Sequence, residues 1–159
     1  MSNSGLVTYQ QIHSTDVERL KCLLRIFGEA FDEIETYQRN PPSDAYLQTL
    51  LSKSHFIAVA ASKDDELVAG LAAYVLDKFE QDRREIYIYD LAVSEAHRRQ
   101  GIATGLINEL QRIAAKQDSY VIFVQADVDD APAIALYESL GTKETAHHFD
   151  IAVHRTNQQ

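Results

Sequence analysis

The stretch from Arg98 to Ala103 combines a glycine-containing turn with the start of a helical pattern. It follows an apolar run at 86–93 that is typical of a strand, and helical spacing of apolar residues begins at Ile102. A strand that leads through such a turn into a helix presents several backbone N–H groups at the positive end of the helix dipole. Gly101 allows a ligand to approach the backbone closely. The pattern therefore predicts a binding loop for phosphate oxygens.

Asp90 lies near the end of the strand that precedes this loop. Strict alternation places Asp90 on the same face as Ile86 and Ile88. A carboxylate on an apolar face is costly unless it is hydrogen-bonded or a cavity opens beside it. Two interpretations remain open. Asp90 is a strand-end residue that reaches solvent or pairs with a backbone N–H, or it is a base at the lip of a cleft beside the phosphate loop.

Tyr137 lies on an amphipathic helical pattern between Pro132 and Gly141. An aromatic residue in such a pattern commonly belongs to the core, but a buried tyrosine hydroxyl prefers a hydrogen-bond partner. That hydroxyl could also donate a proton to a departing thiolate. The sequence alone leaves both roles open.

Hydrophobic periodicity and turn signals predict the elements that position these residues. The first expected helix runs to Gly28, and either Thr15 or Ser14 could cap it. The second covers 44–51, with Ser43 as its cap. Two more helices are expected at 102–116 and 132–141. Strands are expected at 6–12, 56–61, 67–76, 85–93, 120–126 and 148–153, with the polar turn 63–66 joining a hairpin. The run at 120–126 is solidly apolar, as expected of a strand buried on both faces. This order predicts an α/β fold with a mixed sheet rather than a doubly wound one.

The composition is that of a soluble globular protein: 159 residues, 45% hydrophobic and 25% charged, for which we expect one domain over 1–159. The net charge of −9 argues against nucleic acid as a partner and favours cationic ligands. Cys22 is the one cysteine, so no intrachain disulfide can form. No apolar run is long enough to cross a membrane and Met1 begins no leader pattern, so we predict no membrane partner and a cytoplasmic location.

The order of these motifs resembles that of the GNAT acetyltransferases: a strand that ends Asp90–Val93, the loop Arg98–Ala103, and a helix with Leu136-Tyr137 before Leu140-Gly141. A longer similarity, to the type I aminoglycoside 3-N-acetyltransferases (gentamicin acetyltransferases), covers nearly the whole chain past the first strand. It is carried by Leu47–Phe56, Ala72–Leu76, Lys78–Gln81, Glu85–Val93, His97–Ala103, Tyr120–Ile122, Val124–Asp127, Ala135–Tyr137 and His148–Ile151.

This resemblance implies the GNAT acyl-CoA N-acyltransferase fold, with a mixed, mostly antiparallel central sheet and helices on both faces. It implies acetyl-CoA as acetyl donor and, as acceptor, the 3-amino group on the 2-deoxystreptamine ring of a gentamicin-type aminoglycoside. Acetylation would confer resistance by direct transfer, without an acyl-enzyme. The resemblance also implies a homodimer.

Carried over to this chain, the resemblance implies a role for each matched residue. Tyr137 would protonate the leaving thiolate, and Asp90 is our choice for the general base. The backbone of Leu91, Ala92 and Val93 would hold the thioester and pantetheine arm. The amides of Arg98, Arg99, Gln100, Gly101, Ile102 and Ala103 would hold the pyrophosphate, with Thr104 as a further contact.

Because aminoglycosides carry several ammonium groups, acceptor binding should use carboxylates. The candidates are Asp32, Glu33 and Glu35 in an acidic stretch, Asp127 and Asp129 after the fifth strand, and Asp150. We predict no metal site, because the adjacent His147 and His148 would point to opposite faces of a strand. Arg83-Arg84 or Arg98-Arg99 could meet the adenosine phosphates or be solvated surface charge.

Two other functions stay open at this point. The chain could transfer an acetyl group to a polyamine, another small amine or a protein N-terminus. It could also be a non-catalytic acyl-CoA-binding module, although the presence of both Asp90 and Tyr137 argues against that.

Overall fold

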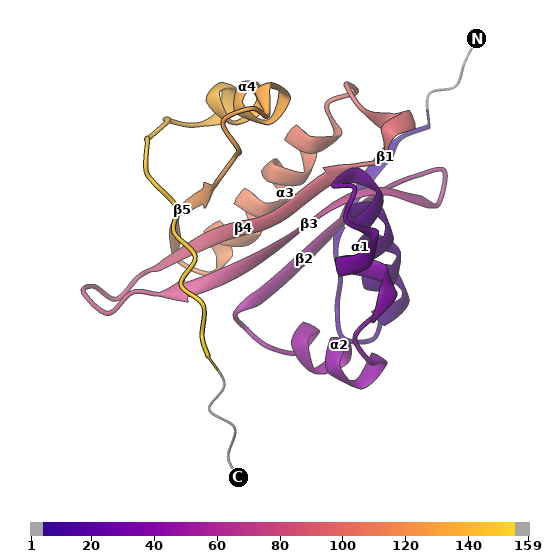
Figure 1. Ribbon diagram of the computed structural model, residues 1–159, viewed down its shortest axis with the longest axis horizontal. Coiled ribbons are helices and arrows are strands. Elements are labelled where there is room, and N and C mark those ends of the chain that lie inside the picture. The colour runs from indigo at the N-terminus through magenta and orange to yellow at the C-terminus, as the bar shows by residue number, and fades with distance from the viewer. Residues whose placement is uncertain (1–4, 155–159) are drawn as a thin grey trace. The chain divides into compact units, whose positions relative to one another are not determined.

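The computed structural model of the chain describes residues 5–154 (Figure 1). Its contacts divide the chain into two compact units, one up to Gln125 and one from Ala126 onward. Our expectation of one domain over 1–159 therefore stays a prediction, and Met1, where we expected no leader, lies outside the described residues. Within 5–154, no helix is both long and apolar enough to cross a bilayer.

The first unit is built on one five-stranded sheet in the order β1-β2-β3-β4-β5. Its strands are β1 (Val7–Gln11), β2 (Phe56–Lys63), β3 (Glu66–Asp77), β4 (Arg84–Val93) and β5 (Ser119–Val124). The pairings from β1 to β4 are antiparallel, and β4 pairs with β5 in parallel. The prediction of a mixed, mostly antiparallel sheet is confirmed.

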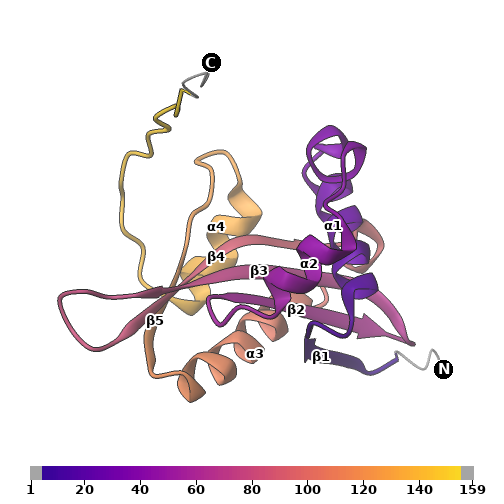
Figure 2. The same ribbon diagram turned by 90° about the horizontal axis from the view of Figure 1, so that it is seen from below.

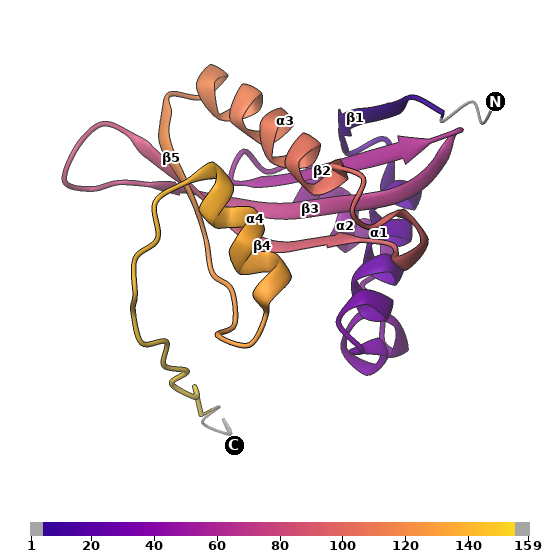
Figure 3. The same cartoon turned by 90° about the horizontal axis from the view of Figure 1, so that it is seen from above.

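Helices cover both faces of this sheet. The helices α1 (Val17–Ala30) and α2 (Asp44–Leu51) lie on one face and α3 (Ile102–Lys116) lies on the other (Figures 2 and 3). Leu23 and Phe27 of α1 are fully buried against small residues of the sheet, which include Ala58, Ala60, Ala72 and Ala92. These alanines let α1 approach the sheet closely, and Gly70 lies where any Cβ would meet Leu23.

Local signals placed most elements of this unit correctly. Ser43 caps α2 by accepting a hydrogen bond from the Tyr46 N–H at 3.2 Å, as predicted. Asp64 and Asp65 both have positive φ, as a two-residue hairpin turn requires. The predicted cap of α1 is wrong: Asp16 holds the N-cap position, and it makes no side-chain capping bond.

The strand β5 differs from its prediction. Among the described residues it pairs with β4 alone and lies at the edge of the sheet, and Tyr120 and Val121 are 50% and 39% exposed. The expectation of burial on both faces is therefore wrong. A continuous apolar run does not distinguish an edge strand from a central one, because strand order is set by pairings remote in sequence.

Over the described residues 126–154, the second unit contains one helix, α4 (Ala131–Leu140). Its first turn holds Pro132, and the Asp130 side chain accepts a hydrogen bond from the Ala133 N–H at 3.1 Å. No strand is formed at 148–153, so that prediction is wrong. Phe149, Ile151 and Val153 alternate in sequence but are 79–92% exposed, because alternation forms a strand only where a neighbouring strand supplies backbone partners.

Candidate active site

The strand β4 carries an irregularity at Tyr89 that decides where Asp90 points. Ile88 pairs with Ala73 of β3 and Asp90 pairs with the adjacent Ala72, so Tyr89 is an extra residue without a partner. Such a β-bulge reverses the alternation beyond it. Asp90 therefore lies on the face of Ala72, which α1 and α2 cover, and not on the face of Ile86 and Ile88. The placement that we predicted for Asp90 is wrong for this reason.

The Asp90 carboxylate is half-buried and hydrogen-bonded to a side chain from another element. The hydroxyl of Tyr37, in the π-helical turn η1 (Glu35–Arg39), donates to Asp90 Oδ2 at 2.9 Å. Burial raises the pKa of Asp90, the bond from Tyr37 lowers it, and the charge of Glu33 raises it, with a net increase. A carboxylate with a raised pKa is a better base than an ordinary aspartate.

Beyond the bulge, β4 loses one of its two neighbours. The pairing with β5 ends at Ile88 and Val124, whereas the pairing with β3 continues through Leu91, Ala92 and Val93. In the part of the chain that the structure describes, no strand pairs with the other edge of β4 from Tyr89 onward. Backbone groups on that edge are therefore available to a ligand that extends along the strand.

The loop after β4 has the geometry expected of an anion-binding turn. A short 3₁₀ turn, η2 (Glu95–His97), precedes it, and Arg99 and Gly101 have φ values of 60° and 77°. Gly101 holds the N-cap position of α3 without a side-chain cap, and the first helical bond runs from the Gly105 N–H to the Gly101 carbonyl. Backbone amides that precede the first helical bond, in a segment with left-handed residues, are the kind of donors that anions bind.

The space over Gly101 is open, since a Cβ built there would meet no atom within 4 Å. Arg98 makes its hydrogen bonds to nearby backbone groups. Its N–H donates to the Glu95 carbonyl, and its side-chain Nε donates to the Val93 carbonyl at 3.2 Å. Gln100 accepts a hydrogen bond from Lys63 Nζ at 3.3 Å. The predicted glycine turn at a helix start is confirmed, whereas the binding roles of its residues stay predictions.

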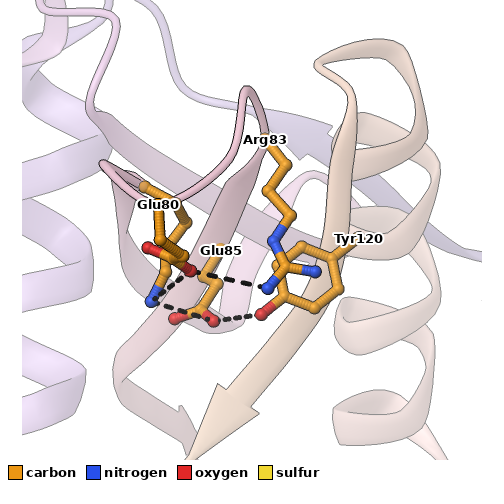
Figure 4. Close-up of polar contacts among 5 residues, drawn as sticks. Glu80, Arg83, Glu85 and Tyr120 are labelled. Atoms are coloured by element: carbon orange, nitrogen blue, oxygen red, sulfur yellow. Dashed lines mark hydrogen bonds and ion pairs between the residues drawn. The ribbon is translucent and has the colours of Figure 1, made fainter.

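The arginine pair at the start of β4 is engaged elsewhere. The Arg83 guanidinium lies 4.0 Å from the ring centroid of Tyr120 and contacts Glu80, while Tyr120 also bonds Glu85 (Figure 4). Arg84 pairs with Asp77 at 2.8 Å and donates to the Gln117 carbonyl. These contacts tie the β3–β4 hairpin to β5, so both arginines have structural partners.

The three early acidic candidates have different surroundings. Asp32 adopts a left-handed conformation with φ of 54° at the end of α1. Glu33 is exposed, and its charge acts on both Tyr37 and Asp90. Glu35 is paired with Arg39 at 2.6 Å. The structure therefore brings Glu33 near Asp90, while the charge of Glu35 is partly offset.

The second unit holds the other candidates. Burial, and then the charge of Asp130, raise the pKa of Tyr137 above its ordinary value. Asp127 and Asp129 are exposed in the turn before α4 and accept backbone hydrogen bonds through their carbonyls. Asp150 is exposed and lies 3.0 Å from His148 Nε2.

Side chains from four strands form an aromatic row on the face that Asp90 shares. Phe56 of β2 packs on Tyr74 of β3, Tyr74 on Tyr89, Tyr89 on Tyr87, and Tyr87 stacks on Phe123 of β5, with centroids 4.8–5.9 Å apart. Phe56 is buried at one end, whereas Tyr89 is 62% exposed beside Asp90. The row presents aromatic surface next to the candidate base.

Residues 21–142 match the acetyltransferase (GNAT) family model. The chain belongs to the acetyltransferase (GNAT) family. An aminoglycoside acetyltransferase from an uncultured soil metagenomic sample has a solved structure that is 53% identical, with a TM-score of 0.92 over 94% of this chain and 99% of that one. A second such enzyme, also from an uncultured soil sample and solved with sisomicin, is 29% identical, with a TM-score of 0.86 over 93% and 97% of the two chains.

Curated relatives match this chain over a shorter region. Human (Homo sapiens) N-acetyltransferase 8 is 28% identical over 89 residues, which cover 56% of this chain and 39% of that protein. The chain thus spans about two fifths of the length of such relatives. GNAT acetyltransferases use acetyl-CoA, and the open space over Gly101 and the uncapped start of α3 fit its phosphates.

Two features of the candidate site were not found from the sequence. Tyr37 lies in an acidic stretch without periodicity, which we expected to be irregular, and no spacing connects it with Asp90. The sequence indicates only part of the aromatic row, namely Tyr87 and Tyr89 on one predicted strand. Its full extent depends on the bulge and on pairing with β3 and β5.

Proposed function

We propose that this acetyltransferase transfers the acetyl group of acetyl-CoA to the 3-amino group of the 2-deoxystreptamine ring of gentamicin-type aminoglycosides. The observation that carries this proposal is the half-buried carboxylate of Asp90, which the bulge turns toward the α1–α2 face in the part of β4 that β5 does not pair with. The likeness to two aminoglycoside acetyltransferases supports the acceptor class.

Direct transfer requires a neutral amine, and an aminoglycoside amine is largely protonated near neutral pH. Asp90 orients the ammonium group and accepts its proton, directly or through water. The amine nitrogen then bonds to the thioester carbonyl carbon while backbone amides at Leu91–Val93 stabilise the charge on its oxygen. As the carbon–sulfur bond breaks, Tyr137 donates a proton to the thiolate. The attacking nitrogen loses its second excess proton as the amide forms, and this proton returns Tyr137 to its neutral form, directly or through water. Atoms and charges then balance without an acyl-enzyme, and Asp90 releases its proton to solvent.

The aromatic row favours a saccharide acceptor over a linear polyamine. Aromatic faces attract ammonium groups, and they also provide flat apolar surface for the C–H faces of sugar rings, which a polyamine lacks. The second soil enzyme was also solved with trehalose, a saccharide without ammonium groups. Together with Asp90 and Glu33, the row offers both kinds of contact that an aminoglycoside requires.

The proposal is tested by coenzyme A release from acetyl-CoA with a panel of amines: gentamicin, kanamycin, spermidine and an N-terminal peptide. We expect turnover with gentamicin and NMR spectra of a product acetylated at the 3-amine. Release with spermidine or the peptide alone would establish the other acceptor class. Binding of acetyl-CoA without release on any amine would show a non-catalytic module.

The aromatic row gives a prediction for acceptor selectivity. We expect Tyr89→Ala to raise KM for gentamicin by about tenfold, because about 1.4 kcal/mol of ring contact is lost. KM for acetyl-CoA should stay unchanged. Phe79→Ala removes another exposed aromatic ring, one that lies outside the aromatic row, and it serves as a control. Equal KM values for gentamicin in the wild type and Tyr89→Ala would contradict a role of the row in acceptor binding.

Gly101 gives a prediction for donor binding. We expect Gly101→Ala and Gly101→Asn to raise KM for acetyl-CoA by about tenfold, because either side chain fills the open space over the loop. Asn tolerates a positive φ better than Ala does. If the effect comes from occupied space, Asn is at least as damaging as Ala; if it comes from backbone strain alone, Asn is the milder change. Initial-rate kinetics with acetyl-CoA varied separate the two outcomes.

The remaining predictions concern the whole protein. Sedimentation of the purified full chain tests the homodimer. Growth of a susceptible bacterium that expresses the chain, compared with one that expresses Asp90→Asn, tests whether acetylation confers gentamicin resistance.

A further inference from the structure

We infer that Tyr37 is a positioning residue for Asp90: its hydroxyl holds one carboxylate oxygen and leaves the other for the acceptor amine. The inference deepens the proposed function, because it rests on Asp90 as the general base. Its observation is the hydrogen bond of 2.9 Å from the Tyr37 hydroxyl to Asp90 Oδ2.

The ring of Tyr37 is fixed by the core. It packs edge-on against Phe27, with centroids 6.0 Å apart, and at a tilt against Phe31, with centroids 5.9 Å apart. Phe27 is 1% exposed and belongs to the cluster between α1 and the sheet. The position of the hydroxyl is therefore set by the same packing that holds β4 and α1 together, and Tyr37 presents a donor at a defined place.

The backbone brings Tyr37 to this place through an unusual turn. The chain reverses at Asp32, which has a positive φ, and the Glu33 N–H donates to the Gly28 carbonyl at 2.9 Å. A Cβ on Gly28 would lie 2.9 Å from Gln38 Nε2 and 3.2 Å from Tyr37 Cβ. The glycine thus permits η1 to approach α1 closely.

The bond constrains the carboxylate where orientation affects the chemistry. Within residues 5–154, Tyr37 is the one side chain that the structure shows hydrogen-bonded to Asp90. Because Oδ2 is engaged, Oδ1 is the oxygen left to accept a proton from the acceptor. A carboxylate free to rotate about its last torsion would spend less time in a productive orientation.

Tyr37 also keeps its proton over the pH range in which Asp90 titrates. Burial raises the pKa of Tyr37, and the charge of Asp90, the hydrogen bond to it and the charges of Glu33 and Tyr89 raise it further. The groups that act on Asp90 are Tyr37, which lowers its pKa, and Glu33, which raises it. Tyr37 is thus a permanent donor to Asp90 and is not itself the proton acceptor.

A purely structural Tyr37, which only ties η1 to β4, would make a different prediction. The test is a ¹³C NMR titration of aspartate carboxyl groups in the full-length protein without substrates. The signal missing from Asp90→Asn identifies Asp90. In Tyr37→Phe, which keeps the ring packing, we expect the midpoint of Asp90 to move to higher pH, because the bond that favours the carboxylate is gone.

Kinetics provide the second measurement. With the acceptor that the wild type uses, we expect Tyr37→Phe to lower kcat about tenfold and to leave KM for acetyl-CoA unchanged. The acid limb of the pH–rate profile should move to higher pH. Tyr46→Phe is the matched control: it removes an exposed hydroxyl from α2 and should leave the Asp90 midpoint in place. An unchanged Asp90 midpoint in Tyr37→Phe, or an unchanged kcat, overturns the inference. If the wild type acetylates no amine, the proposed function fails, while the titration still decides whether Tyr37 controls Asp90.

Discussion

Asp90→Asn is expected to lower kcat by about 100-fold or more with every amine that the enzyme acetylates, because a general base contributes about that factor or more. The amide keeps the size of the carboxylate and can still accept the Tyr37 hydrogen bond, but it cannot take a proton. KM for acetyl-CoA should change little. Single-turnover measurements with enzyme in excess isolate the transfer step from product release.

Although kcat falls in Asp90→Asn, its stability at pH 7 should not fall. The pKa of Asp90 is raised in the folded protein, so the folded state binds this proton more tightly than the unfolded chain does. The stability that this proton contributes is complete below the unfolded pKa of about 3.9 and is lost as pH rises through the folded value. At pH 7 the folded protein holds Asp90 as a half-buried carboxylate, which costs stability, and Asn has no charge to bury. The free energy of unfolding of Asp90→Asn at pH 7 should therefore be equal to or above that of the wild type.

Asp77→Asn is the control for both measurements. Asp77 is also a strand carboxylate with one side-chain partner, the exposed Arg84. We expect wild-type kcat and a change in unfolding free energy below about 1 kcal/mol, as for other exposed ion pairs. If Asp90→Asn kept more than a tenth of the wild-type single-turnover rate, Asp90 would not be the base. A marked fall in its stability would show that the carboxylate is structural.

The same strand shows how far sequence reasoning reaches. The limits of α3, at Ile102 and Lys116, and the Ser43 cap follow from local periodicity and side-chain chemistry, and both were predicted correctly. The face of Asp90 was not, because alternation assumes one residue per step and the extra residue at Tyr89 reverses it. A bulge becomes visible only when the partner strand is known.

The contact between Tyr37 and Asp90 could not be predicted for a similar reason. It joins residues 53 positions apart and depends on a π-helical turn that has no hydrophobic period. Propensity and spacing describe what a segment does alone, whereas this turn forms because its aromatic ring packs on Phe27 and Phe31. The glycine turn before α3 could be predicted because all its determinants lie within a few residues of Gly101.

Tyr137→Phe is the second large effect that we expect: a fall of about 100-fold in the single-turnover rate, with little change in KM for either substrate. The departing thiolate must take a proton, and Phe keeps the ring but offers none. Ser139→Ala is the matched control, because it removes another hydroxyl from α4, one that donates to the Leu136 carbonyl. It should retain wild-type rates.

The pH profile distinguishes proton donation from a mere contact. Burial, and then the charge of Asp130, raise the pKa of Tyr137, so its hydroxyl is protonated and available as a donor at neutral and mildly alkaline pH. The wild-type transfer rate should therefore show no loss from Tyr137 ionisation in that range. Tyr137→Phe should remain slow across the whole range. If its rate recovered to the wild-type value at any pH in that range, thiolate release would not depend on this proton, and the hydroxyl would be a binding contact instead.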